Sequence, residues 1–330
     1  MASETERGVM TESTSCTIEV ADLTFAYSRE PALRDVSFTL APGAVGLLGP
    51  NGSGKTTLLR ALLGQVGIRP GEVTVGGTDM ARQAPEGRRQ LGWMPERGGI
   101  IPGHSGVGLV AYMGELSGMP RQDAMQRAHE VLHFVGLRDE RYRPCETYSQ
   151  GMRQRLKLAC ALVHDPRWLL LDEPTSGLDP GGRAAILELV QDLAGHKGLG
   201  VILSTHLLAD VEATCEELLV LKQGRLLERH AVAPHHVAGR QVFEIAGFGG
   251  EEAFVAGLRR LADAVEQDGR TITAVIDLDA LPAGEGAPSA RAVRAVLELA
   301  RDCDYAPRRM RRRPVTLSDE FHSLVQGEDA

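Results

Sequence analysis

The chain has 330 residues, a net charge of −8 with neutral histidines, and a hydrophobic content of 43%. This length is sufficient for two domains with at least one sizeable core, and the ordinary apolar content excludes a disordered chain. The acidic balance argues against a dedicated nucleic-acid coat.

The five cysteines are scattered and form no C-x-x-C pattern. This usage excludes a disulfide framework and a cysteine-built zinc site, and it suits a reducing cytosol. No apolar run reaches the roughly 18–20 residues that cross a bilayer. Residues 1–16 lack an apolar core, so we expect a flexible tail there and no signal peptide. A role at a membrane would therefore require a partner.

Short β-type runs broken by Pro and Gly begin the chain: TIEVADLTFAYS, RDVSFTLAPGAVGLLG and EVTVGG. Helical periodicity follows from about 105 to 165, as in QDAMQRAHEVLHFVGL. Strand-like apolar runs return at 168–172 and 200–205, with helical stretches between and after them. Strands that alternate with helices predict a parallel α/β sheet. We place a helical subdomain, inserted into this sheet, at about 97–160.

A change in composition marks a second part of the chain. Residues 229–240 contain a Pro and show no clear period, so we expect a linker there after a main domain at 17–228. Beyond it come the run QVFEIAG, a helix near 251–263, the run TITAVIDL, a helix near 289–301 and the segment VTLSDEFHSLV. This alternation predicts a small α+β domain at 241–330.

The strongest chemical motif is GPNGSGKTT at 49–57, which fits G-x-x-x-x-G-K-[ST] and lies between an apolar run and a helical run. Its glycines let backbone N–H groups face the phosphates of a nucleotide. Lys55 adds a positive charge, and the Thr56 hydroxyl can hold Mg²⁺. A Gly-rich surface turn is the alternative, but it does not explain the strand–loop–helix context. The expected nucleotide-binding residues are Gly49, Pro50, Asn51, Gly52, Ser53, Gly54, Lys55, Thr56 and Thr57.

A second motif, WLLLDE at 168–173, places two carboxylates after a buried strand. Ligands of open α/β sheets bind at this edge. Asp172 suits Mg²⁺, which prefers oxygen ligands, and Glu173 could orient and polarise an attacking water. Alone the motif is only a strand end, but a phosphate loop about 117 residues upstream strengthens it.

Four motifs in this order resemble the nucleotide-binding subunit of ATP-binding cassette (ABC) transporters: GPNGSGKTT, YSQGMRQRL, LLLDEPTSGLDP and ILSTHLLADVEATCEELLVLKQGRLL. The resemblance covers about 17–230 and is greatest to the subfamily that pairs with ABC-2-type permeases, which are usually exporters. VTLSDEFHSLV also resembles the C-terminal extension of that subfamily. The implied fold is a P-loop α/β core with an antiparallel β subdomain, a helical insert and a small α+β C-terminal domain.

The resemblance assigns further roles. Tyr27 falls where the family places an aromatic ring under the adenine, although a Tyr in an amphipathic strand is otherwise a core residue. His206 matches the switch histidine that contacts the γ-phosphate, and Asp179 matches the loop that crosses between subunits. Glu96 stands where most members carry a Gln that contacts Mg²⁺ and the attacking water. A solvated loop carboxylate is the alternative for Glu96, which cannot donate a hydrogen bond when charged.

The turn YSQGM at 148–152 has two interpretations. Ser149 can cap a helix of about 150–162, and such a turn also favours an anion. The resemblance implies that Ser149 and Gly151 contact the phosphates of an ATP held by another subunit. Gln150 and Met152 replace the commoner Gly and Gln of the family at this turn.

The implied activity is ATP hydrolysis with Mg²⁺. In this resemblance two subunits, forming a homodimer, sandwich two nucleotides. The implied catalytic residues are Glu173, His206 and Lys55, and the implied metal ligands are Thr56, Asp172 and Glu96. The implied partner is a separate membrane permease, which would place the chain on the cytoplasmic face of the cell membrane; no specific nucleic acid is expected. The alternative is an ABC-type ATPase that acts without a permease on ribosomes or DNA. The usual members of that class carry two cassettes or a coiled-coil insert, and neither is visible here.

Three other patterns have less specific explanations. HEVLH fits the zinc-protease pattern with His129 and His133 on one helical face, but a zinc site needs a third ligand, so a surface helix is favoured. The histidines of the expected linker lack acidic or Cys neighbours. PRRMRRRP at 307–314 could contact anionic lipid or nucleic acid, or it could be a solvated edge of the C-terminal domain.

Overall fold

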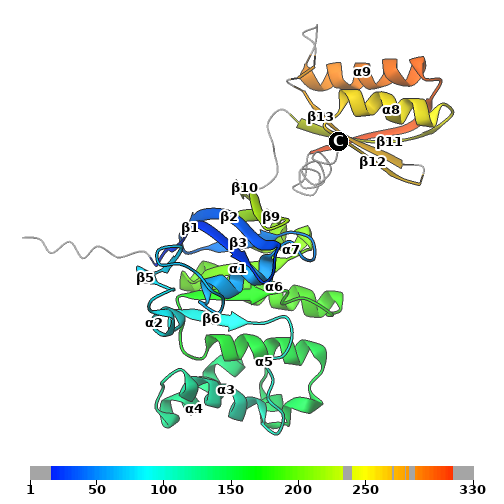
Figure 1. The fold of residues 1–330 in the computed structure, drawn as a ribbon. Coiled ribbons are helices and arrows are strands. Elements are labelled where there is room, and N and C mark those ends of the chain that lie inside the picture. The colour runs from blue at the N-terminus through cyan, green and yellow to red at the C-terminus, as the bar shows by residue number, and fades with distance from the viewer. Residues whose placement is uncertain (1–15, 233–239, 270, 279, 282–286, 315–330) are drawn as a thin grey trace, which may run out of the picture. The chain divides into compact units, whose positions relative to one another are not determined.

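The computed structural model describes residues 16–232, 240–269, 271–278, 280–281 and 287–314 (Figure 1). The chain divides into two compact units between Ala231 and Val232. The segment VTLSDEFHSLV and two of the linker histidines lie outside the described residues. Among the described residues, no helix is long and apolar enough to cross a membrane.

The first unit is built on a six-stranded sheet with the order β10-β9-β3-β8-β7-β6. Four of its five strand pairs are parallel, and β10 is antiparallel to β9. Every residue of β3, β7 and β8 is buried, as expected for parallel strands that are covered on both faces. The predicted parallel α/β sheet is thus confirmed. Its strands are β3 (Ala44–Leu48), β6 (Leu91–Met94), β7 (Trp168–Asp172), β8 (Gly200–Thr205), β9 (Glu217–Lys222) and β10 (Arg225–Ala231).

A second, antiparallel sheet has the order β2-β1-β4-β5. Burial alternates along much of β1 and β2, because only one face of this sheet packs on the core. Helix α1 (Lys55–Leu62) lies between the two sheets, and one apolar cluster joins its leucines to both (Figure 1). This packing fixes the loop that precedes α1. The strands are β1 (Ile18–Ala26), β2 (Pro31–Leu40), β4 (Val73–Val75) and β5 (Thr78–Asp79).

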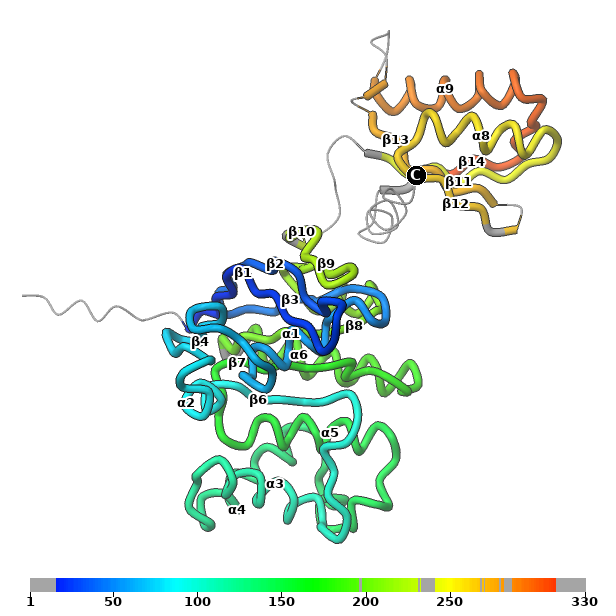
Figure 2. Tube along the Cα trace, in the orientation of Figure 1, coloured from blue at the N-terminus to red at the C-terminus, as the bar shows by residue number. Residues whose placement is uncertain are grey.

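A helical insert separates β6 from β7, as the change of periodicity predicts. Helix α3 packs on α4 through small residues, and Ala124 and Ala128 are fully buried. Helix α5 returns beside β6 (Figure 2). The insert contains α3 (Gly106–Leu116), α4 (Arg121–Phe134), two short 3₁₀ turns (Asp139–Tyr142 and Cys145–Thr147) and α5 (Gln150–Leu162). The remaining helices of this unit are α2 (Ala84–Arg88), α6 (Pro180–Lys197) and α7 (Leu208–Thr214).

The boundaries of this unit differ from the expected ones at both ends. Cys16, which we expected to end a flexible tail, is buried, and its carbonyl accepts a hydrogen bond of 2.6 Å from Nε1 of Trp168. The first unit therefore includes Cys16. At the other end, β10 extends to Ala231 and the next strand begins at Arg240, so both ends of the expected linker are strand residues.

The second unit is a four-stranded antiparallel sheet with two helices on one face. Its strand order is β12-β13-β11-β14, and Phe243, Phe254 and Val296 belong to the core between sheet and helices. This is the α+β arrangement that the alternation predicts. Two strands, β12 and β14, were not predicted, and β14 forms an edge of the sheet from the basic run. The elements are β11 (Arg240–Phe248), α8 (Glu251–Leu261), β12 (Ala264–Asp268), β13 (Thr271–Asp277), α9 (Pro288–Asp302) and β14 (Ala306–Pro314).

Candidate nucleotide-binding site

The phosphate loop joins β3 to α1 and turns through left-handed backbone at Gly52 (φ 81°) and Gly54 (φ 108°). A Cβ at Gly54 would lie 2.7 Å from the carbonyl oxygen of Ala32, so the loop depends on glycine there. Helix α1 begins at Lys55, and no side chain caps its N-terminus. Its first N–H groups and its dipole therefore favour an anion in the loop.

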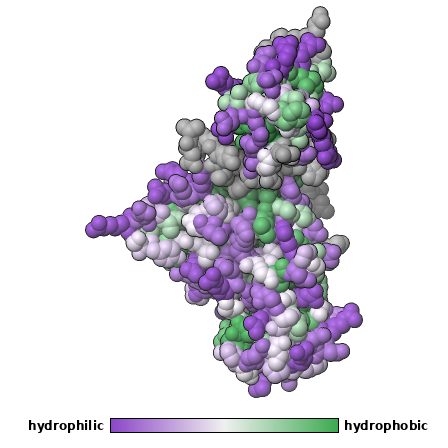
Figure 3. All heavy atoms as spheres, turned by 90° about the vertical axis from the view of Figure 1, so that its right-hand side faces the viewer, coloured by the Kyte–Doolittle hydropathy of each residue, from purple (hydrophilic) through white to green (hydrophobic). Residues whose placement is uncertain are grey.

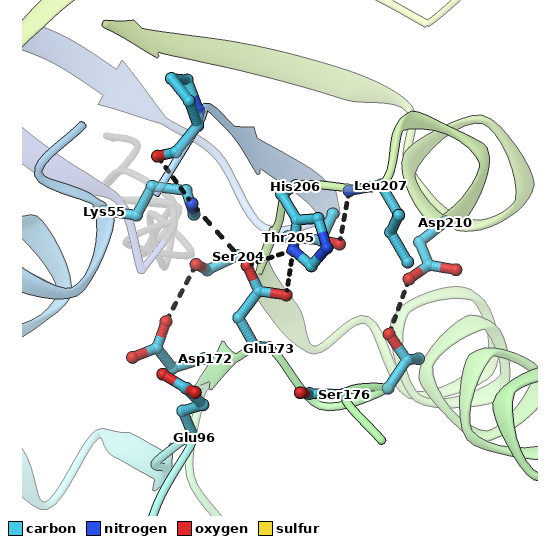
Figure 4. Close-up of polar contacts among 12 residues, drawn as sticks. Lys55, Glu96, Asp172, Glu173, Ser176, Ser204, Thr205, His206, Leu207 and Asp210 are labelled. Atoms are coloured by element: carbon cyan, nitrogen blue, oxygen red, sulfur yellow. Dashed lines mark hydrogen bonds and ion pairs between the residues drawn. The ribbon is translucent and has the colours of Figure 1, made fainter. Parts of the chain in front are cut away.

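Lys55 is held at the centre of this loop. Its Nζ donates hydrogen bonds to the carbonyl oxygens of Gly49 (2.7 Å) and Pro50 (3.3 Å), and it lies 3.7 Å from Oε1 of Glu173. The side chain is only 7% exposed. Lys55 thus brings its charge between the loop and the end of β7, where the phosphates of a nucleotide would lie (Figure 4).

Asp172 ends β7 and is 2% exposed. Its carboxylate accepts hydrogen bonds from Oγ1 of Thr56 (2.8 Å) and from Oγ of Ser204 (3.0 Å), so it connects α1, β7 and β8. Glu96 follows β6 and lies beside Asp172 (Figure 4). Hydroxyl and carboxylate oxygens are the donors that Mg²⁺ prefers, so Thr56, Asp172 and Glu96 fit that cation.

Glu173 follows Asp172 with a left-handed backbone (φ 49°), which is uncommon outside glycine and occurs often at functional sites. Its N–H donates to the carbonyl oxygen of Ser204 (2.9 Å). Nδ1 of His206 lies 2.9 Å from Oε2 and 3.1 Å from Oε1 of Glu173. His206, which follows β8, therefore orients the Glu173 carboxylate (Figure 4).

One cavity of about 500 Å³ gathers ten of the residues that the sequence predicted. Tyr27 at its edge is 59% exposed, so the alternative of a core residue is wrong. The Tyr27 ring forms a T-shaped pair with Phe25, with the ring centroids 4.8 Å apart, and its exposed surface is available to stack on a base. The cavity is lined by Tyr27, Ala32, Asn51, Gly52, Gly54, Lys55, Thr56, Thr57, Glu96, Arg97, Asp172 and Glu173.

Seven predicted residues do not line this cavity: Gly49, Pro50, Ser53, His206, Ser149, Gly151 and Asp179. The last three lie at the starts of α5 and α6. Ser149 is exposed and caps α5, its Oγ accepting from the N–H of Met152 (3.3 Å). Asp179 caps α6, its Oδ1 accepting from the N–H of Gly182 (3.1 Å). Gly151 lies in the first turn of α5. The capping role of Ser149 is therefore confirmed, and its contact with a phosphate stays a prediction.

The other metal-like patterns lie away from this cavity. The ring of His129 packs against Tyr142, with the centroids 6.0 Å apart, and His133 is exposed. His230 pairs with Glu228 on β10, so the expectation that the linker histidines lack an acidic neighbour is wrong for this residue. Within the described part of the chain, no three His, Cys, Asp or Glu residues are grouped to hold a metal ion. Mg²⁺ needs no such group, since it commonly binds one or two carboxylates together with substrate phosphates and water.

Sequence reasoning missed several polar residues that support the site. Ser204 at the end of β8 holds Asp172. Asp210 is fully buried and accepts hydrogen bonds from Thr175 (Oγ1, 2.7 Å) and Arg183, which holds the segment after Glu173. Lys157 reaches the loop at Glu96 from α5. The sequence signal that could have identified these residues is a polar side chain at a position where the apolar pattern predicts burial.

A phosphate loop between β3 and α1, a carboxylate pair after β7 and a helical insert define a P-loop ATPase of the cassette class. The family model described as "ABC transporter" matches residues 33–176. The linearmycin resistance ATP-binding protein LnrL of Bacillus subtilis is 30% identical over 266 residues, which are 80% of this chain and 85% of that protein. The chain therefore belongs to the ABC transporter ATP-binding family.

Other relatives agree. The Nod factor export ATP-binding protein I of Rhizobium sp. is 34% identical over 77% of this chain and 84% of that protein. An ABC transporter ATP-binding subunit of known structure is 29% identical with a TM-score of 0.59, covering 65% of this chain and 89% of the other. The dimeric ATP-binding cassette MJ0796 bound to ADP and Pi shares the fold at 23% identity and a TM-score of 0.61, over 66% and 99%. The chain is thus the ATP-hydrolysing subunit of an ABC exporter.

Proposed function

We propose that two copies of this chain close over two ATP molecules and that each copy completes the site of the other. Members of the family dimerise and act with membrane permeases. The observation that carries the proposal is a division of the site: the cavity contains the phosphate loop, Asp172 and Glu173, whereas Ser149 and Gly151 lie outside it. A second copy would bring its exposed turn to the phosphates.

Within this arrangement, Glu173 acts as the general base or orients the attacking water. Its position beside Lys55 and His206 supports this role, because both partners hold the carboxylate at the cavity. Lys55 and His206 stabilise charge on the transferring phosphoryl group. Phosphoryl transfer needs little covalent chemistry from the protein, so positioning and electrostatics dominate.

Thr56, Asp172 and Glu96 would hold Mg²⁺. When bound, the ion would neutralise negative charge on the phosphates of the nucleotide. Asp172 is prepared for this role, since Thr56 and Ser204 fix both of its oxygens from neighbouring elements. Glu96 is the more exposed of the two carboxylates, at 41% for its side chain.

The permease would contact the helical insert. A groove of about 350 Å³ between the insert and the α/β core is lined by apolar side chains that include Trp93, Met113 and Leu116. Leu116 is 65% exposed, and Figure 3 shows an apolar patch over the insert. Such a surface fits a protein partner, which would hold the chain at the inner face of the cell membrane. A permease-free role on ribosomes or DNA is not favoured, because the relatives include export proteins.

Light scattering of the purified Glu173→Gln variant tests the dimer. This change should slow hydrolysis and trap the closed state, so ATP with Mg²⁺ should shift the molar mass from monomer to dimer. The exposed Glu252→Gln change in the second unit is the matched control and should leave the wild-type behaviour. A monomeric mass for Glu173→Gln at saturating ATP would contradict the proposal.

A further inference from the structure

Helix α5 carries a buried lysine that has no assigned role. Lys157 is 6% exposed and lies between the buried residues Leu156 and Leu158. Its Nζ donates hydrogen bonds to the carbonyl oxygens of Pro95 (2.8 Å) and Glu96 (2.9 Å). These two residues directly follow β6, so the Lys157 side chain binds the backbone of the loop that carries Glu96.

Keeping an ammonium group at this position is costly. Burial lowers the pKa of Lys157, opposed by the charges of Glu96 and Asp172. A buried charge is tolerated only when its hydrogen bonds are good ones. Bonds from a charged donor are stronger than those between neutral groups, so the two carbonyls are held firmly.

Among the described residues, few other contacts hold Glu96 in the loop from Pro95 to Gly99. The carboxylate of Glu96 lies 3.4 Å from Nε of Arg97, whose side chain is 92% exposed. Gly98 and Gly99 adopt left-handed backbone (φ 77° and 80°). A Cβ at Gly99 would lie 3.2 Å from Cδ of Lys157, so the loop packs on the lysine stem. The direction of the Glu96 side chain is thus set mainly through its backbone.

A neighbour on α5 acts similarly on the other catalytic segment. Gln154 is 1% exposed, and its Nε2 donates to the carbonyl oxygen of Ser176 at 3.4 Å. Gln154 and Lys157 are three residues apart and therefore share one face of the helix. This face contacts the segments that carry Glu173 and Glu96.

We propose that Lys157 is a positioning residue for ATP hydrolysis, acting through the backbone of Glu96. The inference rests on the proposed role of Glu96 at the metal and water. Lys157 follows Ser149 by eight residues, about 12 Å along the helix axis at a rise of about 1.5 Å per residue. One rigid helix therefore carries the turn that faces the second copy and grips a loop of its own site (Figure 2). Docking of the turn on a second copy would therefore fix the position of Glu96 relative to Asp172.

The first test compares Lys157→Met with Arg155→Met in the full chain. Met keeps much of the aliphatic stem that packs on Gly99 and removes the ammonium group with both of its hydrogen bonds. We expect kcat to fall about tenfold, the equivalent of one charge-assisted hydrogen bond, with KM for ATP within about twofold. Amide hydrogen exchange of Arg97–Gly99 should become faster. Arg155 lies on the same helix beside Gly136, and its loss should change neither reading.

A double-mutant cycle decides whether Lys157 acts through Glu96. In a Glu96→Ala background, Lys157→Met should cost less than about twofold in kcat, because coupled residues are not additive. Full additivity, or an unchanged kcat with unchanged exchange in the single variant, would overturn the proposal. Lys157→Arg keeps a charged donor and should retain kcat within about threefold; an Arg variant with slow turnover and fast loop exchange would also contradict it. An inactive wild-type chain would instead count against the proposed function.

Discussion

The two halves of the proposed nucleotide site are built in opposite ways. Around the phosphate loop, polar groups are buried and paired within the chain, as in the contacts of Thr56 and Ser204 with Asp172. At the turn before α5, Ser149 is exposed, and its hydroxyl oxygen caps the helix by accepting a hydrogen bond of 3.3 Å from the N–H of Met152. The first half is therefore complete in one chain, whereas the second is an exposed surface that is available to contact a ligand.

This contrast predicts that substitutions in the two halves impair ATP hydrolysis in different ways. Changes in the buried half should stop chemistry within the chain that carries them. Changes in the exposed turn should leave nucleotide binding by a single chain intact and act only when two chains meet. The predictions below probe this difference, beginning with the largest expected effect.

Glu173→Gln should lower the turnover of ATP by about 10²–10⁴-fold, the usual contribution of a general base. ATP should still bind, since the phosphate loop and Lys55 are unchanged. Steady-state phosphate release and titration with a fluorescent ATP analogue measure the two effects. Hydrolysis at the wild-type rate would contradict the role of Glu173 as a general base. The Glu252→Gln variant controls for the loss of one carboxylate.

Gly151→Asp should lower turnover by about tenfold to a hundredfold, because a negative charge would face the phosphates of the second copy's nucleotide. The fold should tolerate it, since a Cβ at Gly151 has only Cδ2 of Leu178 within reach, at 4.0 Å, and an acidic residue suits the first turn of a helix. Binding of ATP to the monomer should stay within about twofold of wild type. A parallel loss of monomer affinity would mean that the turn contacts its own chain's nucleotide.

Tyr27→Ala should have the smallest effect. A stacked base is worth about 1–3 kcal/mol, and the exposed ring of Tyr27 favours the lower end, about fivefold in affinity for ATP. The value of kcat should change little, because the adenine is remote from the transferred phosphate. Tyr27→Phe keeps the ring and should bind ATP as the wild type does; equal losses in both variants would contradict stacking.

Local order in the sequence explains why the buried half was predictable. A phosphate loop works only between a strand and a helix, and that order is visible from residue 44 to 62. Asp172 and Glu173 end an apolar run, so their place at the sheet edge follows directly. The class of fold and most of the cavity could be predicted on this basis.

The missed features depend on partners distant in the sequence. Lys157 contacts Pro95 across 62 positions, and Cys16 is fixed by Trp168 across 152. Strand β14 was not predicted because its run of arginines shows no alternation of apolar and polar residues. The segment forms a strand through its antiparallel pairing with β11. Such contacts arise from packing, which no local pattern specifies.

Mixing two impaired variants tests the shared site most directly. In a mixed dimer of Glu173→Gln and Gly151→Asp, one site combines both defects, and the other combines an intact Glu173 with an intact turn. At equal amounts, half of the dimers are mixed, so the mixture should recover roughly a quarter of wild-type activity when the sites turn over independently. A mixture no more active than the separate variants would contradict a site shared between two chains.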